Sequence, residues 1–249
     1  AGTTAQERTV TIQVEANGDY THPGLIFSSD QIQTIRTNYQ NGMEPWVSAG
    51  NEILEEDGVR ESTDGGYVIK GYETVVNQGN TIWTDTSTVK DSPYGFNNLF
   101  RQDCQTAYQD TLAYIITGET GYAQSAIKTL NKYAALSPAI DGHDAVFVAG
   151  QMAFRLCNTA EILRTATDEK GEPLWSKQDI FNFKCWMMED FVPWIEDFGE
   201  ANGGACALKG MLAIGVFCEN DAIYQSAVNA FFHDENIGVT AAINEFGQN

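Results

Sequence analysis

Hydrophobic residues recur every three to four positions through most of the chain after residue 98. This spacing places them on one face of a helix that packs against other helices. It predicts helices over residues 98–118, 122–135, 146–163 and 179–194, a helical hairpin over 202–232, and a helix-like piece over 239–246. We therefore expect an all-α domain.

The first fifth of the chain contains two different patterns. Residues 1–21 alternate between apolar and polar, which is the period of a short strand, so we expect an extended N-terminal arm at the edge of the domain. Residues 28–39 and 45–56 predict one helix pair. Ser28 or Ser29 can cap its first helix, and Asn41-Gly42 ends that helix, with Pro45 in the first turn of the next.

Residues 57–97 are rich in Gly, Thr, Asp and Asn, carry scattered aromatic residues and show no helical period. An irregular segment of this length in a compact domain is typical of a functional loop or lid. The alternative is a surface insertion that its own aromatic residues hold in place.

An internal repeat indicates how the helices are organised. The segment LAYIITGETGYAQSAI, which starts at Leu112, is echoed by LAIGVFCENDAIYQSAV, which starts at Leu212. Successive antiparallel helix hairpins build either an open solenoid or an α/α toroid, and both are single domains. The irregular segment 57–97 favours an incomplete toroid over residues 1–249, because a simple solenoid rarely contains such an insertion.

The net charge of the chain restricts the classes of molecule that it can bind. The chain has 34 acidic and 14 basic residues and a net charge of −20, which argues against nucleic acid because phosphate binding needs a basic surface. A local basic cleft can still bind an acidic polymer, since salt screens charges over roughly 8 Å. No run of eighteen apolar residues occurs, so we expect no membrane span.

The five cysteines show no Cys-x-x-Cys pair and lie among apolar residues of predicted helices. This pattern favours buried free thiols. One or two disulfides between helices are the alternative for a secreted protein. Metal binding has little support.

Four stretches occur in the order found in the alginate lyase-like superfamily of polysaccharide lyases, which the chain resembles over most of residues 22–249. They are HPGLIFSSDQIQTIR, RQDCQTAYQDTLAYIITGETGYAQSAIKTLNKYA, QMAFRLCNTAEILR and NGGACALKGMLAIGVFCENDAIYQSAV. The resemblance implies a secreted, incomplete α/α toroid that cleaves 1,4-linked polyuronates such as alginate or glucuronan. Cleavage is a β-elimination that leaves 4,5-unsaturated uronate ends and needs no cofactor.

This chemistry needs a group that neutralises the uronate carboxylate, a base that removes the C5 proton and an acid that protonates the leaving oxygen. In the lyases that the chain resembles, the neutralising Asn opens an inner helix, as Asn202 does here. A helix N-terminus also favours negative charge, so Asn202 is the first catalytic candidate. The alternative is that Asn202 only caps its helix.

His143 is the second catalytic candidate, because it lies just before a predicted inner helix and can neutralise a carboxylate or transfer a proton. A surface role is the alternative for this loop residue. Gln151 and Arg155 lie one turn apart on the following helix, and Arg155 can bind a carboxylate with two hydrogen bonds. The alternative is that Arg155 forms a salt bridge with one of the many acidic residues of the protein.

The remaining substrate-binding candidates are Asn97, Asn98, Arg101 and Lys209. The first three lie where the segment 57–97 enters a predicted helix, which makes them a candidate lip for sugars, although an Asn there can also cap the helix. Lys209 lies inside an apolar helix, so its ammonium group reaches either a cleft or the solvent.

The related lyases carry a Glu, Arg and His segment and later a Tyr downstream of the Asn, and these would fall beyond residue 249. We therefore expect the C-terminal part of the family domain to be missing or to be supplied by a second polypeptide. Two other functions fit the pattern. One is an α/α-toroid glycoside hydrolase with paired carboxylates such as Asp103 and Glu161. The other is a non-catalytic helical-repeat scaffold that binds carbohydrate or protein.

Overall fold

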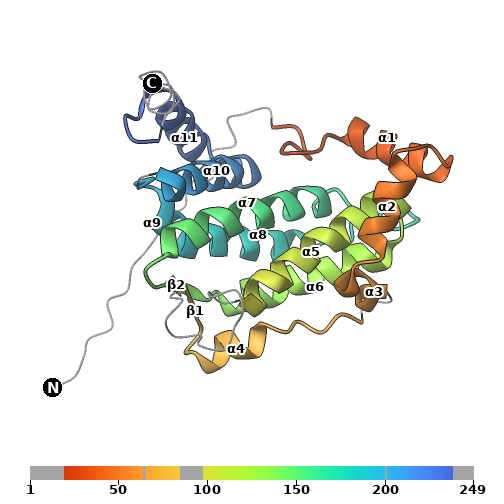
Figure 1. The fold of residues 1–249 in the computed structure, drawn as a ribbon, viewed down its shortest axis with the longest axis horizontal. Helices are drawn as coiled ribbons and strands as arrows, with labels where there is room; N and C mark the ends of the chain where they lie inside the picture. Colours follow the sequence, from red (N-terminus) through yellow and green to blue (C-terminus); the bar gives the residue numbers. More distant parts are fainter. Residues whose placement is uncertain (1–19, 64–65, 85–97, 200, 238–249) are drawn as a thin grey trace.

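The computed structural model describes residues 20–63, 66–84, 98–199 and 201–237, and the chain in these ranges is mostly helical (Figure 1). The first helices are α1 (Ser29–Gln40), α2 (Trp46–Leu54), α3 (Asp57–Ser62), α4 (Tyr72–Asn77), α5 (Asn98–Thr117) and α6 (Thr120–Leu136). The later ones are α7 (Ala145–Leu163), α8 (Lys177–Trp186), α9 (Val192–Ile195), α10 (Ala201–Cys218) and α11 (Asp221–His233). The predicted N-terminal arm, apart from its last two residues, and the piece at 239–246 lie outside the described residues.

The long predicted helices are confirmed. Ser28 caps α1 with a capping box in which Gln31 returns the hydrogen bond, and Asn41 ends the helix. Pro45 is at the N-cap of α2 rather than inside its first turn. The predicted helix over 179–194 is interrupted, because a π-helical turn at Met187–Phe191 separates α8 from α9.

The expectation of an irregular loop over 57–97 is wrong for its described part. Helices α3 and α4 and strand β1 (Thr81–Trp83) form there, and Val59, Tyr67, Val75 and Ile82 are buried in the core. These helices have six residues each, which is too short for a helical period to show in the sequence. The described residues of 57–84 are therefore anchored in the core of the domain by their buried side chains. Residues 85–97 lie outside the described residues.

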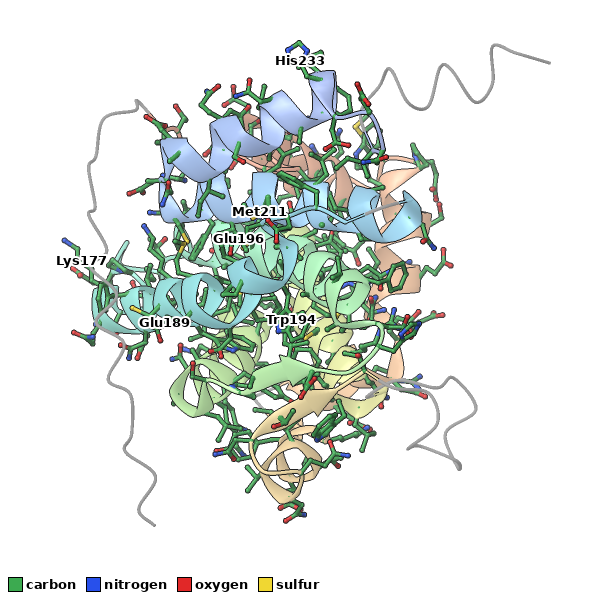
Figure 2. All side chains as sticks on the ribbon, turned by 90° about the vertical axis from the view of Figure 1, so that its left-hand side faces the viewer. Lys177, Glu189, Trp194, Glu196, Met211 and His233 are labelled. Atoms are coloured by element: carbon green, nitrogen blue, oxygen red, sulfur yellow. The ribbon has the colours of Figure 1, made fainter. Side chains whose placement is uncertain are left out.

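Helices α5, α7 and α10 pack side by side in one layer, which we call the inner layer, while α6 and α8 pack against each other and α6 lies against α5. Figure 2 shows α11 above α10, and Lys177 and Glu189 mark the α8 side of the molecule. Arg101 near the start of α5 bonds Gln151 near the start of α7. Arg164 after the end of α7 bonds the carbonyl of Phe217 near the end of α10. The three inner helices therefore run parallel.

The core lies between the two layers and is rich in aromatic rings. Trp175, Phe183, Trp186 and Phe217 are fully or almost fully buried, and Phe183 contacts the other three with ring centroids 5.4–5.8 Å apart. Within the inner layer, α7 and α10 approach so closely that a Cβ atom on Gly150 would lie 2.3 Å from the Cys206 carbonyl. Only glycine fits at this crossing.

The two halves of the internal repeat form equivalent hairpins, α5–α6 and α10–α11. Each turns at a residue with positive φ, Gly118 in the first (φ 82°) and Glu219 in the second (φ 57°). A side chain in this conformation costs about 1–2 kcal/mol. Glu219 is held there by ion pairs with Arg164 (2.6 Å) and Lys184 (3.4 Å).

The segment before α1 crosses the C-terminal ends of α7 and α10. His22 lies 2.9 Å from both Glu161 and Glu219, and the backbone nitrogens of Gly24 and Ile26 donate to Glu161 and Asn158. The N-terminal and C-terminal parts of the described chain are therefore tied together at this end of the inner layer.

All five cysteines are free, and four of them are buried, Cys185 being the partly exposed one. The prediction of buried free thiols is confirmed for these four. Among the described helices, none combines the length and apolarity needed to cross a membrane.

Candidate functional site

Most of the predicted site residues lie on the inner helices: Arg101 near the start of α5, Gln151 and Arg155 in the middle of α7, and Asn202 at the start and Lys209 in the middle of α10. Asn98 is the first residue of α5, and its side chain is not described. Asn97 lies outside the described residues. Because the three helices are parallel, their N-termini gather at one end of the layer, where helix dipoles favour anions.

Arg101, Gln151 and Arg155 interact across the α5–α7 contact, and we call them, together with Lys209 of the neighbouring helix α10, the cationic cluster. A guanidinium nitrogen of Arg101 donates to the Gln151 amide oxygen at 2.6 Å. Burial, and secondly the charge of Arg155, lower the pKa of Arg101, so the two arginines interact across the α5–α7 contact. Within the described part of the chain, neither Arg155 nor Lys209 lies within salt-bridge distance of a carboxylate.

The salt bridge that sequence reasoning offered as the alternative role of Arg155 is thus absent from the described residues. In a chain of net charge −20, it is unusual that Arg155 and Lys209 have no partner carboxylate in the described part of the chain. Arg155 and Lys209 are both half-buried, which strengthens their attraction for an anion relative to a fully exposed position. The cluster therefore suits a ligand that carries carboxylates.

The α10 side of the site is formed by Lys209 and Asn202. The Lys209 ammonium lies 5.3 Å from the centre of the Phe154 ring, in a cation–π contact that turns it toward α7. Asn202 is exposed and precedes Lys209 by seven residues, so both lie on the same face of α10. Since α10 begins at Ala201, Asn202 lies within the first turn and not at the capping position.

Tyr108 is a candidate that the sequence pattern hid. Its spacing placed it on the buried stripe of α5, but its side chain is only half-buried, and it follows Arg101 by two turns on the same face. Burial raises the pKa of its phenol, and the charge of Arg155 partly offsets this rise. In the described part of the chain its hydroxyl has no hydrogen-bond partner. The sequence feature that could have identified Tyr108 is its seven-residue spacing from Arg101, which places both residues on one face of the helix.

His143 is exposed in the turn between strand β2 (Ala139–Asp141) and α7. Strands β1 and β2 pair in parallel, and Thr84 extends the pairing by donating to the carbonyl of Asp141 at 2.8 Å. The Thr84 hydroxyl then accepts from the Asp144 backbone at 3.2 Å. This pairing, which joins distant parts of the chain, holds the turn at the N-terminal end of α7.

The two carboxylates considered for a glycoside hydrolase are buried and bonded within the protein. Asp103 is 0% exposed and accepts from Tyr67, Tyr133 and the backbone of Lys70 and Gly71 at 2.6–2.9 Å. Its pKa is raised because burial outweighs these bonds.

Glu161 is 1% exposed and is bonded by His22, Gly24 and Arg164. Neither Glu161 nor Asp103 is accessible to a sugar. This pair cannot provide the hydrolase chemistry.

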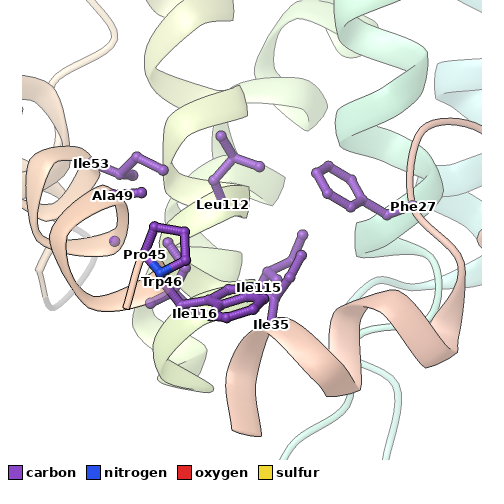
Figure 3. Close-up of a pocket in the computed structure, with 10 residues that line it drawn as sticks. Phe27, Ile35, Pro45, Trp46, Ala49, Ile53, Leu112, Ile115 and Ile116 are labelled. Atoms are coloured by element: carbon purple, nitrogen blue, oxygen red, sulfur yellow. The ribbon is translucent and has the colours of Figure 1, made fainter. Parts of the chain in front are cut away.

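A separate apolar pocket of about 350 Å³ lies between α1, α2 and α5 (Figure 3). It is lined by Phe27, Ile35, Pro45, Trp46, Ala49, Gly50, Ile53, Leu112, Ile115 and Ile116. Leu112 follows Tyr108 by one turn of α5, so the pocket and the cationic cluster lie along the same face of that helix.

Among the described residues, no group of three or more His, Cys, Asp or Glu side chains is arranged to hold a metal ion. Comparison with known proteins gives no relative, since no family model, no curated protein and no solved structure matches the chain significantly.

Proposed function

We propose that this chain is a polyuronate lyase with an incomplete α/α-toroid fold, acting on chains such as alginate or glucuronan. The observation that carries the proposal is the cationic cluster on the inner layer of a strongly acidic protein. The parallel inner helices and the two equivalent hairpins support the toroid. The resemblance noted in the sequence supports the substrate class.

In this proposal the cationic cluster binds and neutralises the uronate carboxylate, with Arg101 and Arg155 as the principal groups. Neutralisation lets the C5 proton leave, because the carbanion that forms shares its charge with the carboxylate. Asn202 donates a further hydrogen bond from the first turn of α10, where the helix dipole also favours negative charge. Lys209 contacts a neighbouring uronate.

Tyr108 is the proposed proton donor. A phenol is protonated at neutral pH. Burial raises the pKa of Tyr108, and the charge of Arg155 partly offsets this rise by stabilising the phenolate that forms when the proton passes to the leaving oxygen. Removal of the C5 proton needs a base close to Tyr108, and His143, in the turn before α7, lies about 20 Å from Tyr108 along the parallel helices. The bond from C4 to the leaving oxygen then breaks as the C4–C5 double bond forms.

The test is an incubation of the full chain with alginate and with glucuronan, followed by the ultraviolet absorbance of the unsaturated uronate. Arg155→Ala should lower the rate about 10- to 100-fold, since it removes charged hydrogen bonds worth about 1.5–3 kcal/mol. Arg60→Ala is the matched control, because Arg60 is an exposed arginine on α3 with a side chain 61% exposed. Equal rates for the two variants, or no product from the native chain, would refute the proposal.

The resemblance noted in the sequence also implies that a second polypeptide could carry further catalytic groups. Comparing the mass of the native particle with that of the denatured chain tests this directly. An active particle built only from this chain would assign both proton transfers to groups on this chain. A second chain in an active particle would instead assign these transfers to the partner.

A further inference from the structure

The apolar pocket has no role in the proposed lyase chemistry. Its lining residues carry no charged side chain and no polar group except the indole nitrogen of Trp46. A sugar ring placed there would lose the hydrogen bonds that its hydroxyls make with water and would gain almost none in return. The pocket is therefore unsuited to be a sugar subsite.

The size of the pocket suits a small apolar group. A volume of about 350 Å³ lies at the lower end of the range found for ligand pockets. Figure 3 shows Phe27 on one side of Leu112, Ile53 and Ala49 on the other, and Ile35 below. Ala49 is exposed at the mouth, so the pocket opens to solvent between α1 and α2.

The neighbourhood of the pocket determines which apolar ligand fits best. Leu112 in the pocket follows Tyr108 by four residues, or about 6 Å along α5. Tyr108 in turn lies within the electrostatic reach of Arg155. The surface thus changes from cationic at Arg101 and Arg155, through the half-buried ring of Tyr108, to fully apolar at Leu112.

We propose that this face binds an aliphatic monocarboxylate, a medium-chain fatty acid, with its alkyl chain in the apolar pocket and its carboxylate at Arg155. The charge of the cluster complements the head group, and the pocket removes the chain from water. Such a ligand would occupy the cationic cluster and compete with a polyuronate for it. The inference uses the cluster of the proposed function but does not depend on cleavage of any polymer.

Calorimetric titration of the full chain with dodecanoate, below its micelle concentration and without polymer, tests the proposal. Ala49→Trp fills the pocket mouth and should weaken dodecanoate binding at least tenfold. Ala135→Trp, the same change at an exposed residue of α6, should leave binding unchanged. Equal affinities for the two variants, or no binding by the native chain, would overturn the proposal.

The head group is tested with dodecanol and with Arg155→Ala. The variant should lose at least tenfold in affinity for dodecanoate and none for dodecanol, which has no carboxylate. An unchanged affinity for dodecanoate would overturn the placement of the carboxylate. Dodecanoate binding in a chain that cleaves no uronate would refute the lyase alone, and cleavage without dodecanoate binding would refute this inference alone.

Discussion

The buried carboxyl group of Asp110 should make the folded protein less stable as the pH rises, which is opposite to the usual effect of a paired carboxylate. The side chain lies on α5, is 1% exposed, and neither carboxylate oxygen has a hydrogen-bond partner among the described residues. Ser62 and Ser125 lie close enough to lower its pKa, yet neither makes a hydrogen bond of normal geometry with it. Burial dominates and raises the pKa of Asp110 from 3.8 to about 7.

The sign of the effect follows from where the proton is bound. Between about pH 4 and pH 7 the folded chain keeps this proton while the unfolded chain loses it, so stability falls as the pH rises through this window. A shift of about 3 pKa units corresponds to about 4 kcal/mol, which is a large fraction of the usual 5–15 kcal/mol of a folded domain. Above pH 7 this contribution is constant.

Asp110→Asn removes the charge and keeps the shape of the side chain. We expect the variant to gain up to about 4 kcal/mol over the native chain at pH 8 and almost nothing at pH 4. Urea unfolding at steps between these pH values measures the difference, with the exposed Glu52→Gln as control. A difference between variant and native chain that does not change with pH would refute the reasoning.

Three further predictions concern packing and buried charge. Gly150→Ala should destabilise the fold by about 1–3 kcal/mol in urea unfolding, because its Cβ meets the Cys206 backbone, and a variant as stable as the native chain would contradict the close α7–α10 crossing. Glu161→Gln should cost about 1.5–3 kcal/mol, since it weakens the charged hydrogen bonds of Arg164 and His22 while both keep Glu219 as a partner; an unchanged stability would contradict this. Titration with a thiol reagent should modify at most Cys185 in the folded chain, and rapid modification of more thiols would contradict their burial.

The sequence predicted the long helices because their apolar spacing repeats over three or more turns. It could not predict α3 and α4, which are too short for such a repeat, nor the pairing of Thr81 with Ala139, which joins strands distant in the chain. The partner of Tyr67 was likewise invisible, because its hydrogen bond to Asp103 joins residues that lie far apart in the chain.

The site was predictable in part. Arg101, Gln151, Arg155 and Lys209 were chosen one helix at a time. The contact of Arg101 with α7, and that of Lys209 with Phe154, depend on how the helices pack, which no local pattern encodes. Tyr108 was missed because its position on the apolar stripe of α5 predicted full burial. Tyr108 is only half-buried because the described neighbouring helices do not cover that part of the stripe, and the position of these helices follows from tertiary packing rather than from the local sequence.

The central claim is that the cationic cluster recognises uronate carboxylates. The most direct measurement is calorimetric binding of an oligouronate and of the same oligosaccharide with its carboxyl groups reduced to alcohols, to the native chain and to Arg155→Ala. We predict that the native chain binds the oligouronate and binds the reduced form at least tenfold more weakly, and that the variant loses this preference. Equal binding of the two oligosaccharides by the native chain would contradict the account.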